Sequence, residues 1–266
     1  MESRFVNYEE GAIHYTDQGD GEVIVLIHGY LESLDVWGRF RDSLLKSFRV
    51  ISVDLPGNGK SSVYTQNHTM CFHAGSILAV LDAEHVDRAF IVGHSLGGYA
   101  TLSLLEKHPE RLKGYVLFHS HPYADTEEII ENRLREMRIV KAGKQDAIYP
   151  VNIPKMFADT NLNRFKEDVD KLINIASGHK AEGIVAVLKG MIQRKSREDI
   201  MSESKVPLLF ILGKMDNYIP YDKTISNIVM PVNGKVITLQ NSGHMGFLEE
   251  TERSVEVISE FILQGI

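Results

Sequence analysis

Short apolar runs that alternate with helical patterns constrain the fold of this chain more than any other feature. The run Val23–Ile27 is uninterrupted and is followed at once by His28-Gly29. Runs of this kind, ended by Gly or Pro, are typical of parallel strands that helices cover on both faces. Six segments share this character, namely Val23–Ile27, Arg49–Val53, Ala89–Val92, Tyr115–Phe118, Val206–Leu212 and Lys235–Leu239.

The segments between these runs predict the helices and the start of the sheet. Trp37–Leu45, Met70–Leu81 and Leu96–Lys107 have the length and spacing of crossover helices. Before the first run, Phe5–Tyr8 and Ala12–Thr16 flank Glu10-Gly11 as an antiparallel hairpin would. Strands that alternate with helices predict an α/β fold, with a mostly parallel central sheet and helices on both faces.

The alternation stops between residues 121 and 200. Apolar residues there follow helical spacing, and Asp125-Thr126-Glu127-Glu128 resembles a capping box for a helix that runs to about Lys141. We therefore expect a helical lid, or cap, at 121–200, inserted into an α/β core formed by 1–120 and 201–266.

Composition excludes several classes of protein. Lys plus Arg number 29 and Asp plus Glu 36, so the net charge is −7, which disfavours a nucleic-acid partner. The single cysteine, Cys71, permits neither an internal disulfide nor a Cys-rich zinc site. The apolar runs are too short to span a membrane, and the N-terminus lacks the apolar stretch of a signal peptide. We expect a cytoplasmic protein, and the sequence leaves its oligomeric state open.

Gly93-His94-Ser95-Leu96-Gly97 is the motif that carries chemistry. It matches G-x-S-x-G and lies between a predicted strand and a predicted helix. A sharp strand-to-helix turn needs small residues on either side of the serine, and it lifts the serine hydroxyl above the edge of the sheet. The helix N-terminus then offers free N–H groups to a developing oxyanion. Ser95 is therefore the candidate nucleophile.

A serine hydroxyl needs a base and an acid that orients the base. His244 follows the predicted strand Lys235–Leu239, and Asp216 follows Val206–Leu212. Open α/β sheets place their sites at the carboxyl ends of strands, where both residues lie. The chain order Ser95, Asp216, His244 is the order of the α/β-hydrolases.

Together these motifs resemble the α/β-hydrolase superfamily, in its branch of esterase-like serine hydrolases with a helical lid. The resemblance covers the chain outside the segment 121–200. It rests on five separate motifs, which are His28-Gly29-Tyr30, Asp54–Ser61, Gly93–Gly97, Gly213–Asp216 and Gly243-His244.

The resemblance implies a catalytic triad and an oxyanion hole. Ser95 would attack, His244 would act as general base and then acid, and Asp216 would orient His244. The backbone N–H groups of Tyr30 and Leu96 would bind the oxyanion. The resemblance implies a small-molecule substrate and no cofactor.

Several other residues are alternative candidates for the triad acid or for a metal site. Asp125 is an alternative triad acid, because some relatives place the acid after the preceding strand, whereas Asp54 precedes Ser95 against the expected order. His119 and His121 suggest a metal only if a third ligand joins them, and we expect no metal site. Asn58 stands where the family usually has histidine, in a loop expected to be structural.

The most specific function that the resemblance implies is hydrolysis of a small to medium uncharged carboxylic ester through an acyl-enzyme on Ser95. The same scaffold also serves carbon–carbon bond hydrolases, lyases and perhydrolases. The loop that starts at His28 has fewer glycines than is usual in carbon–carbon hydrolases. A ligand receptor that keeps the triad but turns over slowly is an alternative of another class.

Overall fold

A single eight-stranded sheet organises the chain. The computed structural model describes residues 2–65 and 67–264, and the strand order is β1-β2-β4-β3-β5-β6-β7-β8. β1 is antiparallel to β2 and β2 to β4, whereas the other neighbouring pairs are parallel. The strands are β1 (Arg4–Tyr8), β2 (Gly11–Gln18), β3 (Val23–Ile27), β4 (Arg49–Val53), β5 (Ala89–His94), β6 (Leu112–Phe118), β7 (Leu208–Gly213) and β8 (Gly234–Leu239).

The mostly parallel α/β sheet predicted from the apolar runs is confirmed, including the N-terminal hairpin. The six apolar runs correspond to β3 through β8, with ends that differ by a few residues. The largest difference is at β6, which begins at Leu112 rather than Tyr115. Lys113 and Gly114 break the apolar pattern there, although the backbone is already extended.

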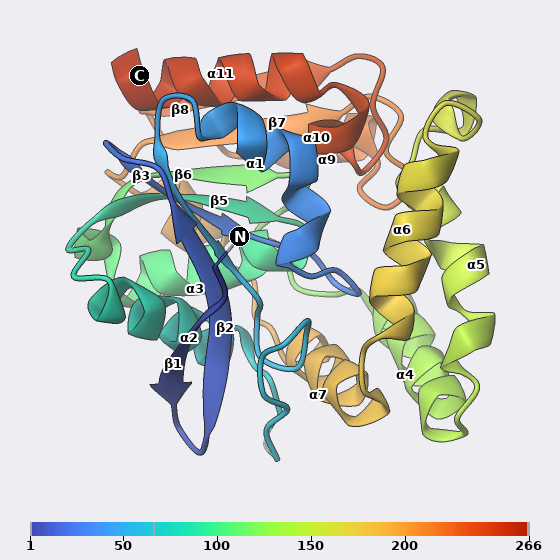
Figure 1. Cartoon of the computed structure of the whole chain (residues 1–266). Helices are drawn as coiled ribbons and strands as arrows, with labels where there is room; N and C mark the ends of the chain where they lie inside the picture. The colour runs from blue at the N-terminus through green and yellow to red at the C-terminus, as the bar shows by residue number, and fades with distance from the viewer. Residues whose placement is uncertain (1, 66, 265–266) are drawn as a thin grey trace.

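Helices cover both faces of the sheet. Figure 1 shows α1 and α11 on one face and α2 and α3 on the other. Apolar side chains at the centres of the strands are almost fully buried between these layers. The helices of this part are α1 (Gly38–Leu44), α2 (Met70–Ala83), α3 (Leu96–Lys107), α9 (Tyr221–Asn227), α10 (Gly246–Glu249) and α11 (Thr251–Gln264).

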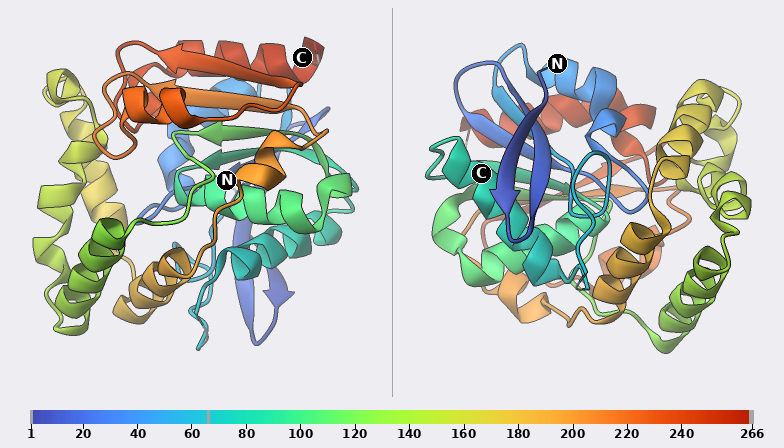
Figure 2. Two further views of the ribbon diagram at one scale, coloured as in Figure 1. Left: turned by 180° about the vertical axis from the view of Figure 1, so that it is seen from behind. Right: turned by 60° about the horizontal axis from the view of Figure 1, so that its bottom comes forward.

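Between β6 and β7, the described chain forms helices and turns but no strand. Most of these helices gather beyond the edge of the sheet toward which the arrowheads of β5 and β6 point, whereas the last of them, Glu198–Ser202, contacts α3 (Figures 1 and 2). Thr126 caps α4, because its hydroxyl accepts a hydrogen bond from the Ile129 N–H. The helices are α4 (Glu127–Lys141), α5 (Tyr149–Asn152), α6 (Lys166–Ser177), α7 (Ala181–Ile192) and α8 (Glu198–Ser202).

The register of the parallel strands brings their carboxyl ends together. Ile27 pairs with Gly93, Phe118 pairs with Ile211, and Gly213 pairs with Leu239. The loops that follow β3, β5, β6, β7 and β8 therefore leave the sheet at one edge, where open α/β sheets place their sites. None of the described helices is both long and apolar enough to cross a membrane.

Candidate active site

Ser95 occupies the sharp turn between β5 and α3. Its backbone has φ 48° and ψ −111°, a conformation that side-chain-bearing residues seldom adopt. The Ser95 N–H donates to the Phe118 carbonyl at 3.0 Å, and the Ser120 hydroxyl donates to the Ser95 carbonyl at 2.8 Å. These bonds hold Ser95 in a strained turn, and such strain is characteristic of functional positions.

Glycines on either side of Ser95 allow this turn. A Cβ atom at Gly97 would collide with the Ile27 carbonyl oxygen at the end of β3. A Cβ atom at Gly93 would lie 2.5 Å from the Gly97 carbonyl oxygen. Because neither position has room for a side chain, the glycines of the G-x-S-x-G motif serve close packing of α3 against the sheet.

Substitution of Gly97 by alanine should therefore destabilise the fold. We expect a loss of roughly 3 kcal/mol in the free energy of unfolding, because the obstacle is backbone that cannot rotate away. The matching fall in melting temperature is roughly 6–12 °C by calorimetry. Gly178→Ala is the control, because a Cβ atom there would come no closer than 3.3 Å to its nearest neighbour, the Ile175 carbonyl oxygen. Equal melting temperatures for the two variants would contradict this account.

The predicted acid and base are directly bonded. His244 Nδ1 lies 2.7 Å from Asp216 Oδ2. The other carboxylate oxygen, Oδ1, accepts the N–H groups of Tyr218 at 2.8 Å and Ile219 at 2.9 Å. With its carboxylate fixed in this way, Asp216 selects the orientation of the imidazole and leaves Nε2 as the ring nitrogen able to take a proton.

Electrostatics favour an ionised acid in this pair. Burial raises the pKa of Asp216, but the charge of His244 and hydrogen bonds from His119 and His244 outweigh it and hold the pKa well below its usual range. Burial lowers the pKa of His244, but the charge and hydrogen bond of Asp216 outweigh it and leave the pKa raised. The negative charge of Asp216 would thus stabilise a protonated His244.

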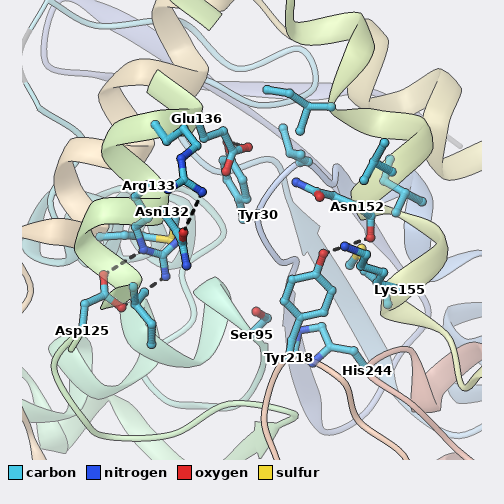
Figure 3. Close-up of a pocket in the computed structure, with 18 of the residues that line it drawn as sticks. Tyr30, Ser95, Asp125, Asn132, Arg133, Glu136, Asn152, Lys155, Tyr218 and His244 are labelled. Atoms are coloured by element: carbon cyan, nitrogen blue, oxygen red, sulfur yellow. Dashed lines mark hydrogen bonds and ion pairs between the residues drawn. The ribbon is translucent and has the colours of Figure 1, made fainter. Parts of the chain in front are cut away.

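Ser95 and His244 line one cavity of about 640 Å³. Figure 3 shows Asp125 and Arg133 on one side of Ser95, and Tyr218 and His244 on the other. Much of the lining comes from the segment between β6 and β7, and part of it is apolar. The apolar lining residues from that segment are Ile129, Ile139, Ala147, Ile148, Val151, Ile153, Met156 and Met191.

The two predicted oxyanion donors lie on the expected elements. Tyr30 follows β3 and lines the cavity, and its hydroxyl donates to Glu136 Oε1 of α4 at 2.8 Å. Leu96 is the first residue of α3, so its N–H has no acceptor within the helix. The structure thus brings Tyr30, Ser95 and Leu96 to the same end of the sheet.

A buried acid–histidine pair that the motifs did not reveal lies beside the site. Glu32 Oε2 accepts the Gly29 N–H at 2.7 Å and lies 3.1 Å from His94 Nδ1. The other ring nitrogen of His94 lies 2.9 Å from the His244 carbonyl oxygen. The pair therefore ties the loop of Tyr30 to the loop of His244. Its only sequence signal is the position of Glu32, three residues after Gly29.

Glu249 is a second residue that sequence reasoning missed. Its Oε1 accepts the Gly243 N–H at 2.9 Å, and its Oε2 accepts the Ala158 N–H at 2.9 Å. Nearby, the His244 N–H donates to the Met156 carbonyl at 2.6 Å. The loop of His244 is thus fastened to the segment between β6 and β7, a contact that no spacing in the sequence signals.

The two alternative triad acids, Asp54 and Asp125, bond residues other than His244. Asp54 lies 2.7 Å from His14 Nδ1 and accepts the backbone N–H groups of Leu34 and Lys60, so it braces its own loop. Asp125 lines the cavity but bonds Arg133 at 2.8 Å and Arg194 at 2.6 Å.

The other residues that the sequence analysis considered, His119, His121 and Asn58, lie in different surroundings. His119 Nδ1 lies 3.4 Å from Asp216 Oδ2, whereas His121 Nε2 lies 3.3 Å from the Tyr99 hydroxyl. Within the described residues, the donor atoms of His119, Asp216 and His244 lie within 4.8 Å of one another, but Asp216 and His244 already bond each other there. The Asn58 amide donates to the Pro56 carbonyl at 3.2 Å, within its own loop.

Comparison with known proteins supports this assignment of the fold. A family model described as the alpha/beta hydrolase fold matches residues 22–138. A solved structure of a thermophilic esterase from Thermogutta terrifontis, with malate bound, superposes with a TM-score of 0.93, 24% identity and 99% coverage of both chains. The enol-lactonase from Burkholderia xenovorans LB400 superposes with a TM-score of 0.87 at 19% identity, covering 97% of this chain and 99% of that one.

The chain is also similar to a relative whose name describes a different hydrolase reaction. The chain is 25% identical over 288 residues to a 2-hydroxy-6-oxononadienedioate/2-hydroxy-6-oxononatrienedioate hydrolase of Burkholderia vietnamiensis. The match covers 98% of this chain and 95% of the relative. The chain is therefore similar along its whole length to hydrolases of more than one substrate class.

Proposed function

We propose that this chain, whose residues 22–138 match the alpha/beta hydrolase family model, is a serine hydrolase that cleaves carboxylic esters through an acyl-enzyme on Ser95. The hydrogen bond of 2.7 Å between Asp216 and His244, beside a cavity that Ser95 also lines, is the observation that carries this proposal. The helices between β6 and β7, within 121–200, act in it as a cap over the cavity. Their apolar side chains favour an ester with an apolar portion.

The proposed mechanism has two halves. His244 Nε2 takes the proton of Ser95 as its oxygen attacks the ester carbonyl, and the N–H groups of Tyr30 and Leu96 bind the resulting oxyanion. The same imidazole then protonates the departing alcohol. In the second half, water attacks the acyl-enzyme and His244 takes the proton of the water. His244 then gives this proton to the Ser95 oxygen as its bond to the acyl carbon breaks, which frees the carboxylic acid and restores the Ser95 hydroxyl.

A fluorophosphonate probe tests the nucleophile directly. It should modify the folded protein once, on Ser95, and mass spectrometry of the digested protein should locate the label. Prior treatment with a p-nitrophenyl ester should slow the labelling, because substrate and probe compete for one hydroxyl. A folded protein that the probe leaves unlabelled would refute the proposal.

Carbon–carbon bond hydrolysis is the second candidate, favoured by the similarity to the dienedioate hydrolase. Against it, the loop His28–Ser33 contains one glycine, whereas the loops of carbon–carbon hydrolases are glycine-richer. The two reactions separate in a direct comparison of kcat/KM for a p-nitrophenyl ester and for 2-hydroxy-6-oxononadienedioate. A higher value for the dienedioate would favour the second candidate.

The rate of ester hydrolysis should rise with pH. The base must be neutral, and the pKa of His244 is raised above its ordinary value of 6.5 by Asp216, which outweighs the opposing effect of burial. Below that pKa, protonated His244 cannot accept the Ser95 proton, and above it the base is free. We therefore expect the midpoint of the acidic limb of kcat/KM to lie above 6.5, measured with an uncharged ester. A midpoint below that value would contradict the role of Asp216.

A further inference from the structure

We infer that the Tyr99 hydroxyl donates a hydrogen bond to an oxygen atom of the substrate, so that the cavity selects esters with a second acceptor oxygen near the scissile carbonyl. The inference deepens the proposed serine-hydrolase function and rests on it. Two observations support the inference: the position of Tyr99 in the cavity and the direction in which its hydroxyl proton must point.

Tyr99 lies one helical turn beyond Ser95. It is on α3, four residues after Ser95, so the two share a face of the helix. The Tyr99 side chain is largely buried, and it lines the same cavity as Ser95 and His244. A hydroxyl at this place can reach the part of a substrate next to the reacting carbonyl.

The tautomer of His121 sets the role of the Tyr99 hydroxyl. The Tyr123 N–H donates to His121 Nδ1 at 3.2 Å, so this nitrogen carries the lone pair. Burial and the nearby charge of Arg194 lower the pKa of His121 to about 3, so the ring stays neutral near pH 7. Its single proton therefore lies on Nε2, which is 3.3 Å from the Tyr99 hydroxyl oxygen.

Because His121 donates to Tyr99, the proton of the Tyr99 hydroxyl is free for another acceptor. Within residues 2–65 and 67–264, the structure provides no other hydrogen-bond partner for this hydroxyl. The open side of Tyr99 is the cavity, so a substrate oxygen that enters it meets a hydroxyl proton that no protein acceptor among the described residues takes.

Neighbouring charges hold Tyr99 rigidly in place. The Arg194 guanidinium lies over the Tyr99 ring, with 4.0 Å between its central carbon and the ring centroid. Arg194 is itself fixed by Asp125 at 2.6 Å and by the Tyr123 carbonyl at 3.2 Å. A donor whose ring cannot swing away is suited to discriminate between substrates.

The same side of the cavity favours acceptors over donors. Arg133 and Arg194 share the single carboxylate of Asp125, and the other carboxyl group on this side, Glu136, already accepts the Tyr30 hydroxyl. Asp125 is thus engaged by two protein donors, and one oxygen of Glu136 by a third. An ether, hydroxyl, keto or carboxylate oxygen fits here better than an N–H donor.

Two esters of equal length test the inference. In p-nitrophenyl methoxyacetate an ether oxygen replaces one methylene of p-nitrophenyl butyrate. Tyr99→Phe should lower kcat/KM for the methoxyacetate roughly tenfold, the effect of one lost hydrogen bond to a buried donor, and change kcat/KM for the butyrate less than about twofold. Because each ester is compared between two enzymes, its intrinsic reactivity cancels.

Tyr115→Phe is the matched control. Its hydroxyl is also buried, but Tyr115 lies on β6 and does not line the cavity, so the variant should treat both esters as the wild type does. The wild type gives a second measurement that needs no variant: its preference for the methoxyacetate should exceed the ratio of the two hydroxide-catalysed rates.

The outcomes are distinct. Equal losses of kcat/KM for both esters in Tyr99→Phe, or a wild-type preference no greater than that of hydroxide, would overturn the inference and leave the proposed function standing. A wild type that cleaves neither ester in a Ser95-dependent way would overturn the proposed function and the inference with it.

Discussion

Ser95→Ala is expected to lower kcat for ester hydrolysis by about 10⁶-fold, because removing the nucleophile of a triad removes nearly all of its catalysis. The strained backbone of Ser95, with φ 48°, holds Ser95 at the start of α3, where it lines the cavity that His244 also lines. Alanine fits the same backbone but has no oxygen to attack with. What remains is the rate that the oxyanion donors and binding alone provide, about 10³–10⁴ over water.

The measurement is steady-state hydrolysis of p-nitrophenyl butyrate, with a fluorophosphonate label as the active-site count for the enzymes that keep Ser95 and the concentration of folded protein as the reference for Ser95→Ala. Ser76→Ala is the matched control, since Ser76 is a buried serine whose hydroxyl donates to the His73 carbonyl of its own helix, α2. It should keep wild-type kcat. If Ser95→Ala retained activity within tenfold of the wild type, a different nucleophile would have to be sought.

Asp216→Asn is expected to lower kcat by about 10⁴-fold, with the fold intact. The asparagine oxygen would take the place of Oδ1, which accepts the N–H groups of Tyr218 and Ile219. The amide NH₂ would then face His244 Nδ1 and force the lone pair on to that nitrogen. The ring proton would move to Nε2, so His244 could no longer accept the proton of Ser95.

The comparison variant is Asp125→Asn, because Asp125 is the alternative acid and also lines the cavity. Its carboxylate bonds Arg133 and Arg194 rather than the imidazole of His244, so kcat should fall far less than in Asp216→Asn. Activity of both variants is compared at equal concentrations of folded protein. A larger loss in Asp125→Asn would transfer the role of the acid to Asp125.

Sequence predicted the core of the molecule because the core depends on local patterns. An uninterrupted apolar run such as Val23–Ile27 requires burial on both faces, and the glycines around Ser95 mark a turn without room for side chains. The order of Asp216 and His244 after their strands followed from the same pattern. In the structure these two residues bond each other, and His244 lines one cavity with Ser95.

The rest depends on contacts between residues that are distant in sequence. Glu32 and His94 are 62 residues apart, and the Glu249 carboxylate reaches Ala158 across 91 residues. No spacing rule joins such pairs, because each partner is placed by a different loop. The spacing on α3 does not distinguish Tyr99 from a packing residue, since its helix shows an apolar face whether or not a cavity lies beside it.

Between β6 and β7 the sequence predicted helices, which the structure contains, but it did not predict how short several of them are. Residues 145–161 fold as short 3₁₀ and α-helical pieces, such as Tyr149–Asn152. Elements this short complete no apolar stripe, so periodicity cannot reveal them. They nevertheless supply several lining residues of the cavity, among them Ile153 and Met156.

β6 and β7 are neighbours in the sheet, although residues 119–207 separate them in the chain. The entropy of closing so long a connection grows only with the logarithm of its length, so doubling it would cost about 0.6 kcal/mol. The entropic cost of pairing β6 with β7 therefore depends little on the length of the segment that connects them. Evolution or protein engineering could exchange much of the cavity lining in this connection while Ser95, Asp216 and His244 stay on their strand ends, provided that the contacts of Met156 and Ala158 with the loop of His244 are kept.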